Sequence, residues 1–513
     1  FTLLIPLILH NSSFDICTSP LIPLDICNKL SAIVKTDSPC EPVRNINASN
    51  SLELRDLTPY LRPLSRGRSV LGISRIIIPQ PPPTLYYKSF QKSHGKISKL
   101  AQYRLSLSRG VPMKNNYPNI TISNEGETWL QKGQMWMYRN NLVQADENIP
   151  DGGIVNIIST DGTYHGTGFY SPISHITCRI LTKDESESID QAFFEKRIRF
   201  AYDYRRTVEP NNLSNCRYVF GEADLLPGLV VDCYNDILVT QISNTGMEQH
   251  KQMIYDILLE TFKENSHVIQ AIYERNDIKV REKEGLTSYK GFFYNPNHVS
   301  PQTIINENGI QLQVDIENGQ KTGYFLDQKS NRVLLRHIAR DKRVLDCFSH
   351  TGGFALNAAY GNAKAVTAVD VSNVALQQGY QNAKLNHLED KIQFVQADVF
   401  DYLEQLKGNE FDIIVLDPPA FTKSRKTVNN AYYGYKNINM KAMNVLRNGG
   451  YLITCSCSRF METKLFEQML LESAKECGVT LRQISVTQQN PDHPILWTMD
   501  ETSYLKYFIF QIL

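Results

Sequence analysis

Short, mainly apolar runs separated by turn residues recur through the C-terminal part of the chain. The clearest are residues 343–348, 365–369, 392–396, 411–416 and 451–454. Runs of this kind are typical of strands buried on both faces of a parallel sheet. Helix-type segments fill the intervals, and strands near 480–484 and 504–512 are expected to close the sheet. The pattern predicts an α/β domain over residues 307–513.

Upstream of this domain the pattern changes twice. Residues 113–185 contain short β-type runs broken by turns such as Asp151-Gly152-Gly153, which suits a small β-barrel. Residues 186–306 combine a helix expected at 186–204 with strands and a second helix, so we predict a middle α+β domain. Trp129, Trp136 and Tyr138 in the first segment either stack on bases or fill the core of the barrel.

Residues 1–112 differ in composition from the rest. No Asp or Glu occurs from Leu57 to Asn124, whereas basic residues recur there and Pro79–Pro83 favours extended backbone. Such a segment resembles an organelle targeting leader, and it also fits sequence translated from upstream of a natural start at Met113. In both cases we expect an extension with little packed structure.

The overall composition excludes some classes of protein. Lys+Arg 54 against Asp+Glu 53 gives a net charge of +1, so binding to nucleic acid would have to come from local basic patches. The 10 cysteines show no C-x-x-C pair, which favours a reducing compartment, and His175-x-x-Cys178 alone predicts no metal site. No apolar run approaches the roughly 20 residues of a membrane span. We expect a cytoplasmic protein without a membrane partner.

The segment Lys342–Ser372 has the pattern strand, glycine turn, helix, strand, acid. Thr351, Gly352 and Gly353 form the turn, where the missing side chains allow close approach to a ligand. Asp370 ends the second strand, and a carboxylate there can accept hydrogen bonds from a ribose diol. The turn lacks the third glycine of a dinucleotide site, so another nucleoside, or no ligand at all, fits equally well.

Three further strand ends carry candidate functional groups. Asp417-Pro418-Pro419 follows the strand 411–416, and the prolines end it rigidly while leaving carbonyl acceptors free. Asp398 follows the strand 392–396 and predicts either a helix cap or a ligand contact. Cys455 and Cys457 come at the end of the strand 451–454, where strand alternation sends both to one side. A thiol near Asp417 is a candidate nucleophile, although buried cysteines are usually inert.

The ordered set of motifs from about residue 116 to residue 513 resembles the bacterial large-subunit rRNA cytosine-5 methyltransferases that carry an N-terminal PUA domain. The matching segments, besides those above, are Gly168–Pro172, Ser186–Asp190, Asp224–Leu229, Val280–Gly285 and Lys321–Gln328. The resemblance implies a Rossmann-like class I methyltransferase domain, a PUA-type β-barrel, S-adenosylmethionine as cofactor and a cytosine of 23S rRNA as substrate. It also implies ribosomal RNA as partner before or during ribosome assembly, with a homodimer as one option.

Carried over residue by residue, the resemblance assigns roles. Cofactor contacts are implied for Phe348, Thr351, Gly352, Gly353, Asp370, Asp398, Asp417 and Pro418. Cys457 matches the nucleophile that adds to C6 of the base, and Asp417 is expected to bind the base edge. Cys455 is expected to serve packing. The target base must be unpaired or flipped out to reach Cys457.

Local basic positions supply the predicted RNA contacts. Lys279, Arg281 and Lys283 are expected to alternate along one strand face. Lys423 and Arg425 follow the Asp-Pro-Pro motif, where an RNA strand would enter. Lys196 and Arg199 share a predicted helix face, which is either a phosphate contact or a solvated surface.

Two other functions share part of this pattern. An rRNA guanine methyltransferase acting at N2 or N7 would share the Asp-Pro-Pro feature but needs no thiol. A noncatalytic RNA-binding assembly factor would not need the intact set of Gly352, Gly353, Asp370, Asp398, Asp417 and Cys457. Finally, Asp327 is expected either to cap a helix at 328–339 or to contact the cofactor.

Overall fold

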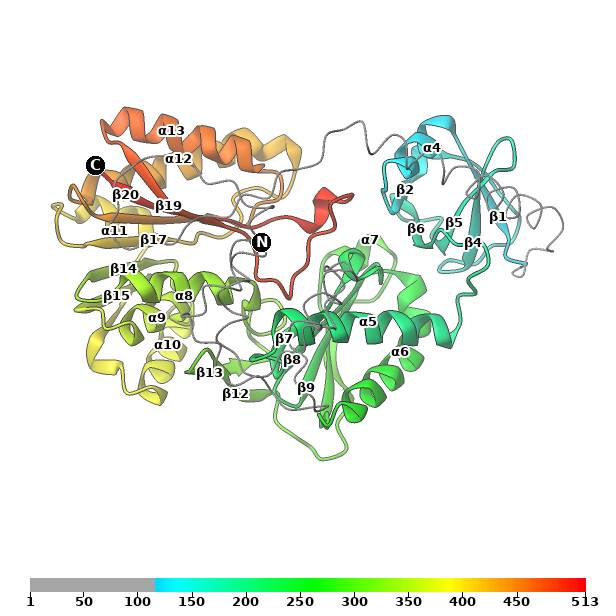
Figure 1. The fold of residues 1–513 in the computed structure, drawn as a ribbon, viewed down its shortest axis with the longest axis horizontal. Coiled ribbons are helices and arrows are strands. Elements are labelled where there is room, and N and C mark those ends of the chain that lie inside the picture. Colours follow the sequence, from blue (N-terminus) through cyan, green and yellow to red (C-terminus); the bar gives the residue numbers. More distant parts are fainter. Residues whose placement is uncertain (1–115) are drawn as a thin grey trace, which may run out of the picture. The chain divides into compact units, whose positions relative to one another are not determined.

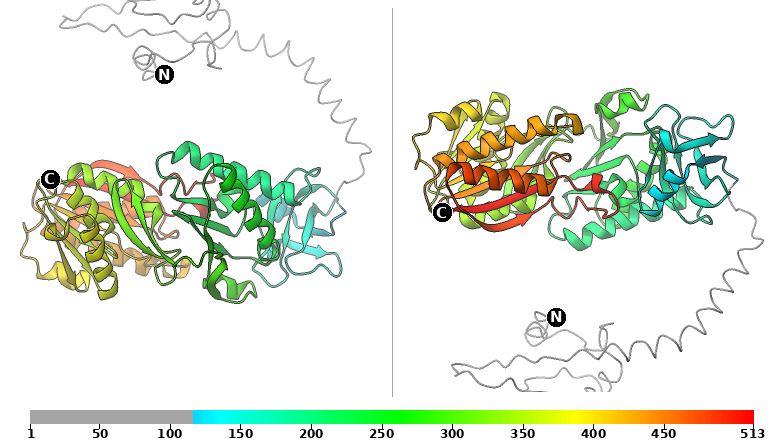
Figure 2. Two further views of the ribbon diagram at one scale, coloured as in Figure 1. Left: turned by 90° about the horizontal axis from the view of Figure 1, so that it is seen from below. Right: turned by 90° about the horizontal axis from the view of Figure 1, so that it is seen from above.

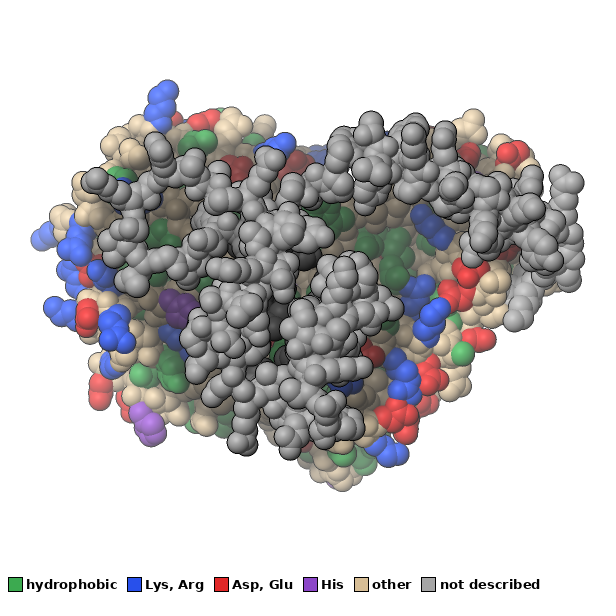
Figure 3. Space-filling model, viewed as in Figure 1, with side chains coloured by type: hydrophobic (Ala, Val, Ile, Leu, Met, Phe, Trp, Pro, Cys, Tyr) green, Lys and Arg blue, Asp and Glu red, His purple; other side chains and the backbone are tan. Residues whose placement is uncertain are grey.

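A computed structural model describes residues 116–513, which form four β-sheets and the helices around them (Figure 1). The expectations for residues 1–112 lie outside the described residues. No helix of the described part combines the length and apolar character needed to cross a membrane. Basic and acidic side chains are intermixed on the face shown in Figure 3.

The first sheet has six strands in the order β2-β6-β5-β4-β1-β3. Its strands are β1 (Asn119–Ile122), β2 (Trp136–Tyr138), β3 (Leu142–Ala145), β4 (Ile154–Ser159), β5 (Tyr164–Tyr170) and β6 (Ile176–Thr182). Helix α4 (Asn124–Gln131) is capped by the preceding Ser123, whose hydroxyl accepts a hydrogen bond from the Gly126 amide at 3.2 Å. Apolar residues of these strands form a separate small core that includes Ile120, Met137 and Val155.

The second sheet has five strands in the order β11-β10-β9-β8-β7. They are β7 (Asn215–Phe220), β8 (Leu229–Tyr234), β9 (Ile237–Ile242), β10 (Ala271–Asn276) and β11 (Tyr289–Tyr294). Helices α5 (Gln191–Val208) and α6 (Thr245–Glu264) pack with this sheet around one apolar core. The helix expected at 186–204 begins later because the Asp190 carboxylate caps it, accepting from the Phe193 amide at 3.1 Å.

The strand expected through Lys279, Arg281 and Lys283 is wrong. These residues lie in and next to a short helix, α7 (Val280–Lys283). Arg281 is buried and donates to the Glu248 carboxylate at 2.8 Å and to the Ile242 carbonyl at 2.7 Å. An alternation over five residues does not fix a strand, and the partner that buries Arg281 comes from α6. Arg281 is therefore not a surface cation of an RNA-binding stripe, whereas Lys279 is exposed.

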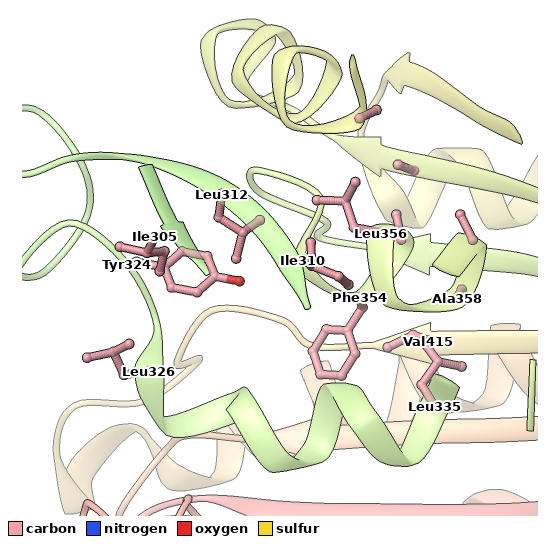
Figure 4. Packing of buried hydrophobic residues seen from close by; sticks show 14 of the residues in the cluster. Ile305, Ile310, Leu312, Tyr324, Leu326, Leu335, Phe354, Leu356, Ala358 and Val415 are labelled. Atoms are coloured by element: carbon pink, nitrogen blue, oxygen red, sulfur yellow. The ribbon is translucent and has the colours of Figure 1, made fainter. Parts of the chain in front are cut away.

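A hairpin of β12 (Gln302–Glu307) and β13 (Ile310–Asp315) leads into the C-terminal domain. The boundary expected between residues 306 and 307 falls inside this hairpin. Its apolar residues Ile305, Ile310 and Leu312 belong to the same core as Phe354 and Leu335 of the α/β domain (Figure 4). The hairpin is thus packed onto the α/β domain, and it anchors the segment that follows β13.

The C-terminal domain is built on a seven-stranded sheet in the order β16-β15-β14-β17-β18-β20-β19. Its strands are β14 (Arg343–Cys347), β15 (Ala365–Asp370), β16 (Ile392–Gln396), β17 (Ile413–Leu416), β18 (Tyr451–Ser456), β19 (Leu481–Thr487) and β20 (Lys506–Ile512). The first five are parallel and β20 is antiparallel to both neighbours. All seven strands occur close to the positions that the apolar runs predict.

Helices cover both faces of this sheet. One face carries α8 (Lys329–Ile338), α9 (Gly353–Tyr360) and α10 (Asn373–Leu385), and the other carries α12 (Val428–Val445) and α13 (Thr463–Cys477) (Figures 1 and 2). A shorter helix, α11 (Val399–Gln405), contacts α12. The order of strands reverses between β14 and β17. In open α/β sheets, ligands bind at such a reversal, beyond the carboxyl ends of the strands.

Candidate active site

The glycine turn after β14 has the strained backbone expected of a ligand-binding turn. Phe348, His350 and Gly352 all have positive φ angles, of 61°, 51° and 82°. Such angles cost free energy for Phe and His, so the surrounding contacts must hold them in place. The His350 amide donates to the Asp370 carboxylate at 2.9 Å, and the Gly352 amide donates to the Ser349 carbonyl at 2.8 Å.

Gly353, at the start of α9, has no room for a side chain. A Cβ there would lie 2.9 Å from the hydroxyl of Tyr324 and 3.1 Å from Cδ of Arg332. Arg332 in turn is paired with Glu307 of the hairpin through two hydrogen bonds of 2.7 and 2.6 Å. The glycine therefore lets the segment after β13 close over the turn.

Four polar atoms beside this turn are buried and have no hydrogen-bond partner within residues 116–513. They are Asp346 Oδ1, the Tyr324 hydroxyl, Asp327 Oδ1 and Ser349 Oγ. Buried polar groups are rarely left without partners, so each is a candidate ligand contact. Asp346 is the most unusual, since its other oxygen accepts from the Ala355 amide at 2.9 Å at the start of α9. Burial raises the pKa of Asp346 well above its usual range, and Asp417 and Asp370 add to this.

Two other predicted cofactor residues lie at the ends of neighbouring strands. Asp370 ends β15 and uses one oxygen for His350 and the other for the Ser372 amide, each at 2.9 Å. Each carboxylate oxygen has a second lone pair, so Asp370 retains acceptor capacity for a ribose diol. Asp398 caps α11, where only Oδ1 accepts from the Phe400 and Asp401 amides. The predicted cap is confirmed, and it leaves Oδ2 for a ligand.

Asp417 follows β17 at the reversal of strand order. Its Oδ2 accepts a hydrogen bond from Gln328 Nε2 at 3.0 Å. Burial raises the pKa of Asp417 to about 7, the nearby Asp327 carboxylate adds to the shift, and the Gln328 contact opposes it. At neutral pH this carboxyl group therefore exists in both charge states and is able to donate as well as accept a proton.

The two cysteines occupy different environments. Cys455 lies within β18 and is fully buried, next to Tyr507 of β20. Cys457 lies beyond the last residue of β18 and is half-buried. Both thiols nevertheless lie near the Asp417 carboxyl group, on the one side that strand alternation predicts, and Cys455 is a hydrogen-bond partner of Asp417. The Sγ of Cys457 is 4.0 Å from the carbonyl oxygen of Pro418, so this thiol adjoins the Asp-Pro-Pro turn.

The pKa of Cys457 depends on charged groups at the end of β17 and at the start of β20. Burial, together with the nearby carboxylates of Asp417 and Asp327, raises the pKa of the Cys457 thiol to about 11. The exposed Lys321 and the buried Lys506 of β20 both oppose this shift. Burial in turn lowers the pKa of Lys506 to about 8, and the ammonium donates to the carbonyls of Ser458 at 2.7 Å and Tyr504 at 2.8 Å.

The prediction that Asp327 caps the helix after it is wrong. Asp327 lies in a short 3-10 turn (Leu326–Gln328), and α8 begins without any side-chain cap. The Asp327 carboxylate instead accepts from the Tyr504 hydroxyl at 2.6 Å, a partner from a distant part of the chain. Its second oxygen is one of the four unpartnered atoms beside the turn, so the alternative role as a ligand contact remains a prediction.

The predicted RNA-contacting residues are scattered. Lys423 and Arg425 are exposed on the segment after the Asp-Pro-Pro turn. Lys196 is paired with Glu187 at 2.7 Å, and Arg199 is paired with Glu195 at 2.9 Å, which favours a solvated helix face. In the first sheet, the Trp136 indole donates to Glu222 of the middle domain at 2.9 Å.

Two groups at the site were missed by sequence reasoning. Asp346 and Lys506 are charged residues inside apolar strands, at the carboxyl end of β14 and the start of β20. The sequence does contain a clue to both residues, because a charged side chain within a buried strand requires either a partner of opposite charge or a function. Among the described residues, no cluster of three or more His, Cys, Asp or Glu side chains is arranged to hold a metal ion.

Comparison with known proteins gives this site a chemical class. A family model described as S-adenosylmethionine-dependent methyltransferase matches residues 298–511, and a PUA-like domain model matches residues 120–183. The fold is also that of a Streptococcus mutans protein assigned as a SAM-dependent methyltransferase, with a TM-score of 0.64, 24% identity and coverage of 76% of this chain and 99% of that one. SMU.776, solved in complex with SAH, gives a TM-score of 0.65. The protein is thus an S-adenosylmethionine-dependent methyltransferase with a PUA-like domain.

Two curated relatives define the family more closely. Ribosomal RNA large subunit methyltransferase I of Klebsiella pneumoniae strain 342 is 37% identical over 402 residues, which are 77% of this chain and 99% of the relative. The protein of the same name from Pseudoalteromonas translucida is 40% identical over 387 residues, 75% of this chain and 96% of the relative. The chain belongs to the ribosomal RNA large subunit methyltransferase I family.

The residues at the turn fit the cofactor of this class. S-adenosylmethionine carries two cationic groups, a sulfonium and an ammonium, beside a ribose and an adenine. The unpartnered oxygens of Asp346 and Asp327 are acceptors suited to a cationic ligand, and Gly352–Gly353 leaves space for close approach.

Proposed function

We propose that the protein transfers a methyl group from S-adenosylmethionine to C5 of a cytosine in 23S rRNA, through a covalent bond between Cys457 and C6 of the base. The observation that carries this proposal is the position of the Cys457 thiol, 4.0 Å from the Pro418 carbonyl and beside Asp417. A methyltransferase acting on an amino group or on N7 of guanine has no use for a thiol at this place.

The residues have separable tasks in this reaction. Cys457 Sγ adds to C6, and the electrons of the C5–C6 double bond make C5 nucleophilic. The carboxylic acid form of Asp417 protonates N3 as negative charge develops on the ring. When bound, S-adenosylmethionine supplies the electrophilic methyl group that C5 accepts. A base then removes the C5 proton, the double bond re-forms as the thiolate leaves C6, and N3 returns its proton to the Asp417 carboxylate.

The pKa values of Asp417 and Cys457 support these separate roles. With a pKa of about 7, Asp417 has a substantial protonated fraction at neutral pH. With a pKa of about 11, the Cys457 thiol is mostly protonated and needs a neighbouring cation or base to become a nucleophile. Lys506 is the buried cation that favours the thiolate, and we propose that it supports the attack.

The substrate class follows from the relatives, whose name states a ribosomal RNA of the large subunit. Within an RNA helix the edge of a cytosine is inaccessible to a thiol at the end of a strand, so we propose an unpaired or flipped-out target. Lys423 and Arg425 are exposed just after the Asp-Pro-Pro turn and are suited to phosphate contacts there. The PUA-like domain at residues 120–183 is proposed as a second RNA contact.

Trapping tests the covalent step directly. RNA from cells lacking the gene, with 5-fluorocytosine in place of cytosine, should form a stable adduct with the wild-type protein in the presence of S-adenosylmethionine. The fluorine cannot leave as a proton, so the Sγ–C6 bond persists. Mass spectrometry of the adduct should place the RNA on Cys457, and nucleoside analysis of normal RNA should show 5-methylcytosine.

The paired cysteine gives a matched control. Cys457→Ala should form no adduct and no 5-methylcytosine while still binding S-adenosylmethionine. Cys455→Ala should retain turnover and lose about 1 kcal/mol of unfolding free energy through lost packing. Near-normal methylation by Cys457→Ala would reject the cytosine-5 assignment, and methylated guanine in the product would replace it with the guanine methyltransferase.

A further inference from the structure

A cavity of about 200 Å³ is lined by residues of the PUA-like domain, the middle domain and the methyltransferase domain. None of its lining residues belongs to the glycine turn of the cofactor site. The cavity is lined by Trp136 of β2, by Phe220 and Glu222 at the end of β7, and by Gln241 of β9. Arg459 and Glu501 of the C-terminal domain complete it. None of these residues has a task in the methyl transfer described above.

The walls of this cavity combine aromatic rings with hydrogen-bond acceptors. Trp136 supplies a flat surface on which a planar ring can stack, and Phe220, whose ring lies under the Arg217 guanidinium, adds apolar wall. The Glu222 carboxylate accepts from the Trp136 indole at 2.9 Å, which fixes the orientation of both side chains. Glu501 accepts from Arg459 through Oε1, and its Oε2 is buried without a partner in the described part of the chain. A ligand that donates hydrogen bonds would satisfy that oxygen.

The size of the cavity limits what it holds. Pockets for drug-sized molecules and cofactors run from about 300 to 1,000 Å³, so this one is smaller. That space suits one heterocyclic base and excludes a base pair or a whole dinucleotide.

The cavity is close to the proposed nucleophile along the chain. Arg459 comes two residues after Cys457, and both follow the end of β18. One extended chain step spans about 3.3–3.6 Å, so the backbones of the two residues are within about 7 Å. An RNA strand that places a cytosine at Cys457 would therefore bring a nearby nucleotide to Arg459.

We propose that this cavity binds an unpaired guanine base of the RNA substrate, within a few nucleotides of the cytosine presented to Cys457. The inference rests on the proposed function for the position of the cytosine. Guanine is selected because its N1–H and N2–H groups are parallel donors that match a carboxylate such as Glu501. Arg459 is placed beside the same carboxylate and matches the acceptors O6 and N7. Adenine, cytosine and uracil each lack this pair of adjacent donors.

Trp136 provides a direct readout that does not depend on methyl transfer. The chain has 3 tryptophans, so the double variant Trp129→Phe/Trp497→Phe leaves Trp136 as the only indole. The probes are short uridine-rich RNA oligonucleotides with one central cytosine and a single guanine placed at each other position in turn. We expect quenching of Trp136 fluorescence, and at one or two positions a guanine should tighten binding about tenfold, equivalent to about 1.4 kcal/mol.

Base analogues and protein variants then test the assigned contacts. Inosine, which lacks the N2 amino group, should lose most of the gain at the favoured position. Glu501→Gln should abolish the preference for guanine while leaving S-adenosylmethionine binding unchanged, and Val230→Phe, which fills the cavity, should do the same by a different route. Glu467→Gln, at an exposed position of α13, should keep the preference.

The outcomes separate this inference from the proposed function. Equal binding of all oligonucleotides, or a guanine preference that persists in both Glu501→Gln and Val230→Phe, overturns the guanine site. A preference that depends on Glu501, in a protein whose RNA product contains no 5-methylcytosine, supports the site and rejects the cytosine-5 assignment.

Discussion

Asp417 is a single carboxyl group whose proton uptake links the stability of the fold to pH. In the folded protein burial raises its pKa to about 7, whereas an aspartate in an unfolded chain has a pKa of about 3.9. Between these values the folded state binds a proton that the unfolded state has released. The contribution to stability is therefore fully present below about pH 4 and is lost as pH rises towards 7.

This linkage predicts how the stability of a variant depends on pH. Asp417→Asn removes the titrating group, so its free energy of unfolding should decrease less than that of the wild type between pH 4 and pH 7. Urea denaturation at several pH values measures the difference between the two proteins. Asp390→Asn changes an exposed carboxylate and should follow the wild type. Parallel curves for wild type and Asp417→Asn would show that the carboxyl group titrates normally.

Asp370 is expected to contribute to cofactor affinity in two ways. Its carboxylate holds the His350 amide of the strained turn and retains lone pairs for the ribose. Asp370→Ala should therefore weaken S-adenosylmethionine binding by about 1.5–3 kcal/mol, the range for hydrogen bonds to charged groups. Isothermal titration calorimetry measures this loss, with Asp390→Ala as the control. An unchanged dissociation constant would remove Asp370 from the cofactor site.

The residues that sequence reasoning found and missed differ in a simple way. Asp417 and Cys457 directly follow apolar strands, so their position at the sheet edge was readable from local pattern. Asp346 and Lys506 lie inside such strands, and their significance depends on partners far away in the sequence. Arg281 was misplaced for the same reason, because its burial depends on Glu248 of α6. Local pattern locates strand ends but does not reveal which distant groups converge there.

At the scale of elements, the pairing of β18 with β20 builds the environment of the thiol. The register places Lys506 opposite Ser456, one residue before Cys457. The sequence predicted both strands and their places in the sheet because their apolar runs are long. It did not predict the register, which decides that a cation rather than Tyr507 lies at the end of β18.

Lys506→Met tests whether this cation supports the thiolate. The substitution keeps the length of the side chain and removes the charge, so the pKa of Cys457 should rise further. One unit of pKa corresponds to a tenfold change in thiolate fraction, so we expect methylation at neutral pH to slow about tenfold. The pH–rate profile under single-turnover conditions should shift its rising limb to higher pH.

Two further variants separate charge from structure at this position. Lys506→Arg retains the cation and should restore much of the rate, whereas a purely structural role would not shift the pH profile in either variant. Lys475→Met removes an exposed lysine of α13 and should behave as wild type. If Lys506→Met does not shift the pH–rate profile, Lys506 contributes to packing alone.

At the scale of the whole described chain, buried ion pairs join the middle domain to the methyltransferase domain. Lys329 of α8 is buried, with its ammonium 3.2 Å from Glu209 after α5 and 3.4 Å from Asp492. Asp492 also accepts from Asn490 and lies 2.7 Å from His493. Lys329 is held by groups from both domains, so these domains are expected to unfold together.

Lys329→Met tests this coupling. The variant leaves Glu209 and Asp492 buried without their cation, and breaking a buried pair in this way typically costs about 3–5 kcal/mol. We expect a loss of this size in urea denaturation, and a single unfolding transition that separates into two. Lys364→Met, at an exposed position, should keep the wild-type transition. A small loss with one transition would show that Lys329 is not what couples the two domains.

The position of β20 between β18 and β19 has a kinetic consequence for how the enzyme matures. Strand β19 is made first, yet it reaches the sheet only through β20, which must insert between two strands that precede it. Until then β18 is an open edge with unpaired amides, and such edges recruit other chains. Until β20 is in place, Lys506 does not lie opposite Ser456 and the environment of Cys457 is incomplete. Slow insertion of β20 would therefore delay catalytic competence and make this stage of folding the most prone to aggregation.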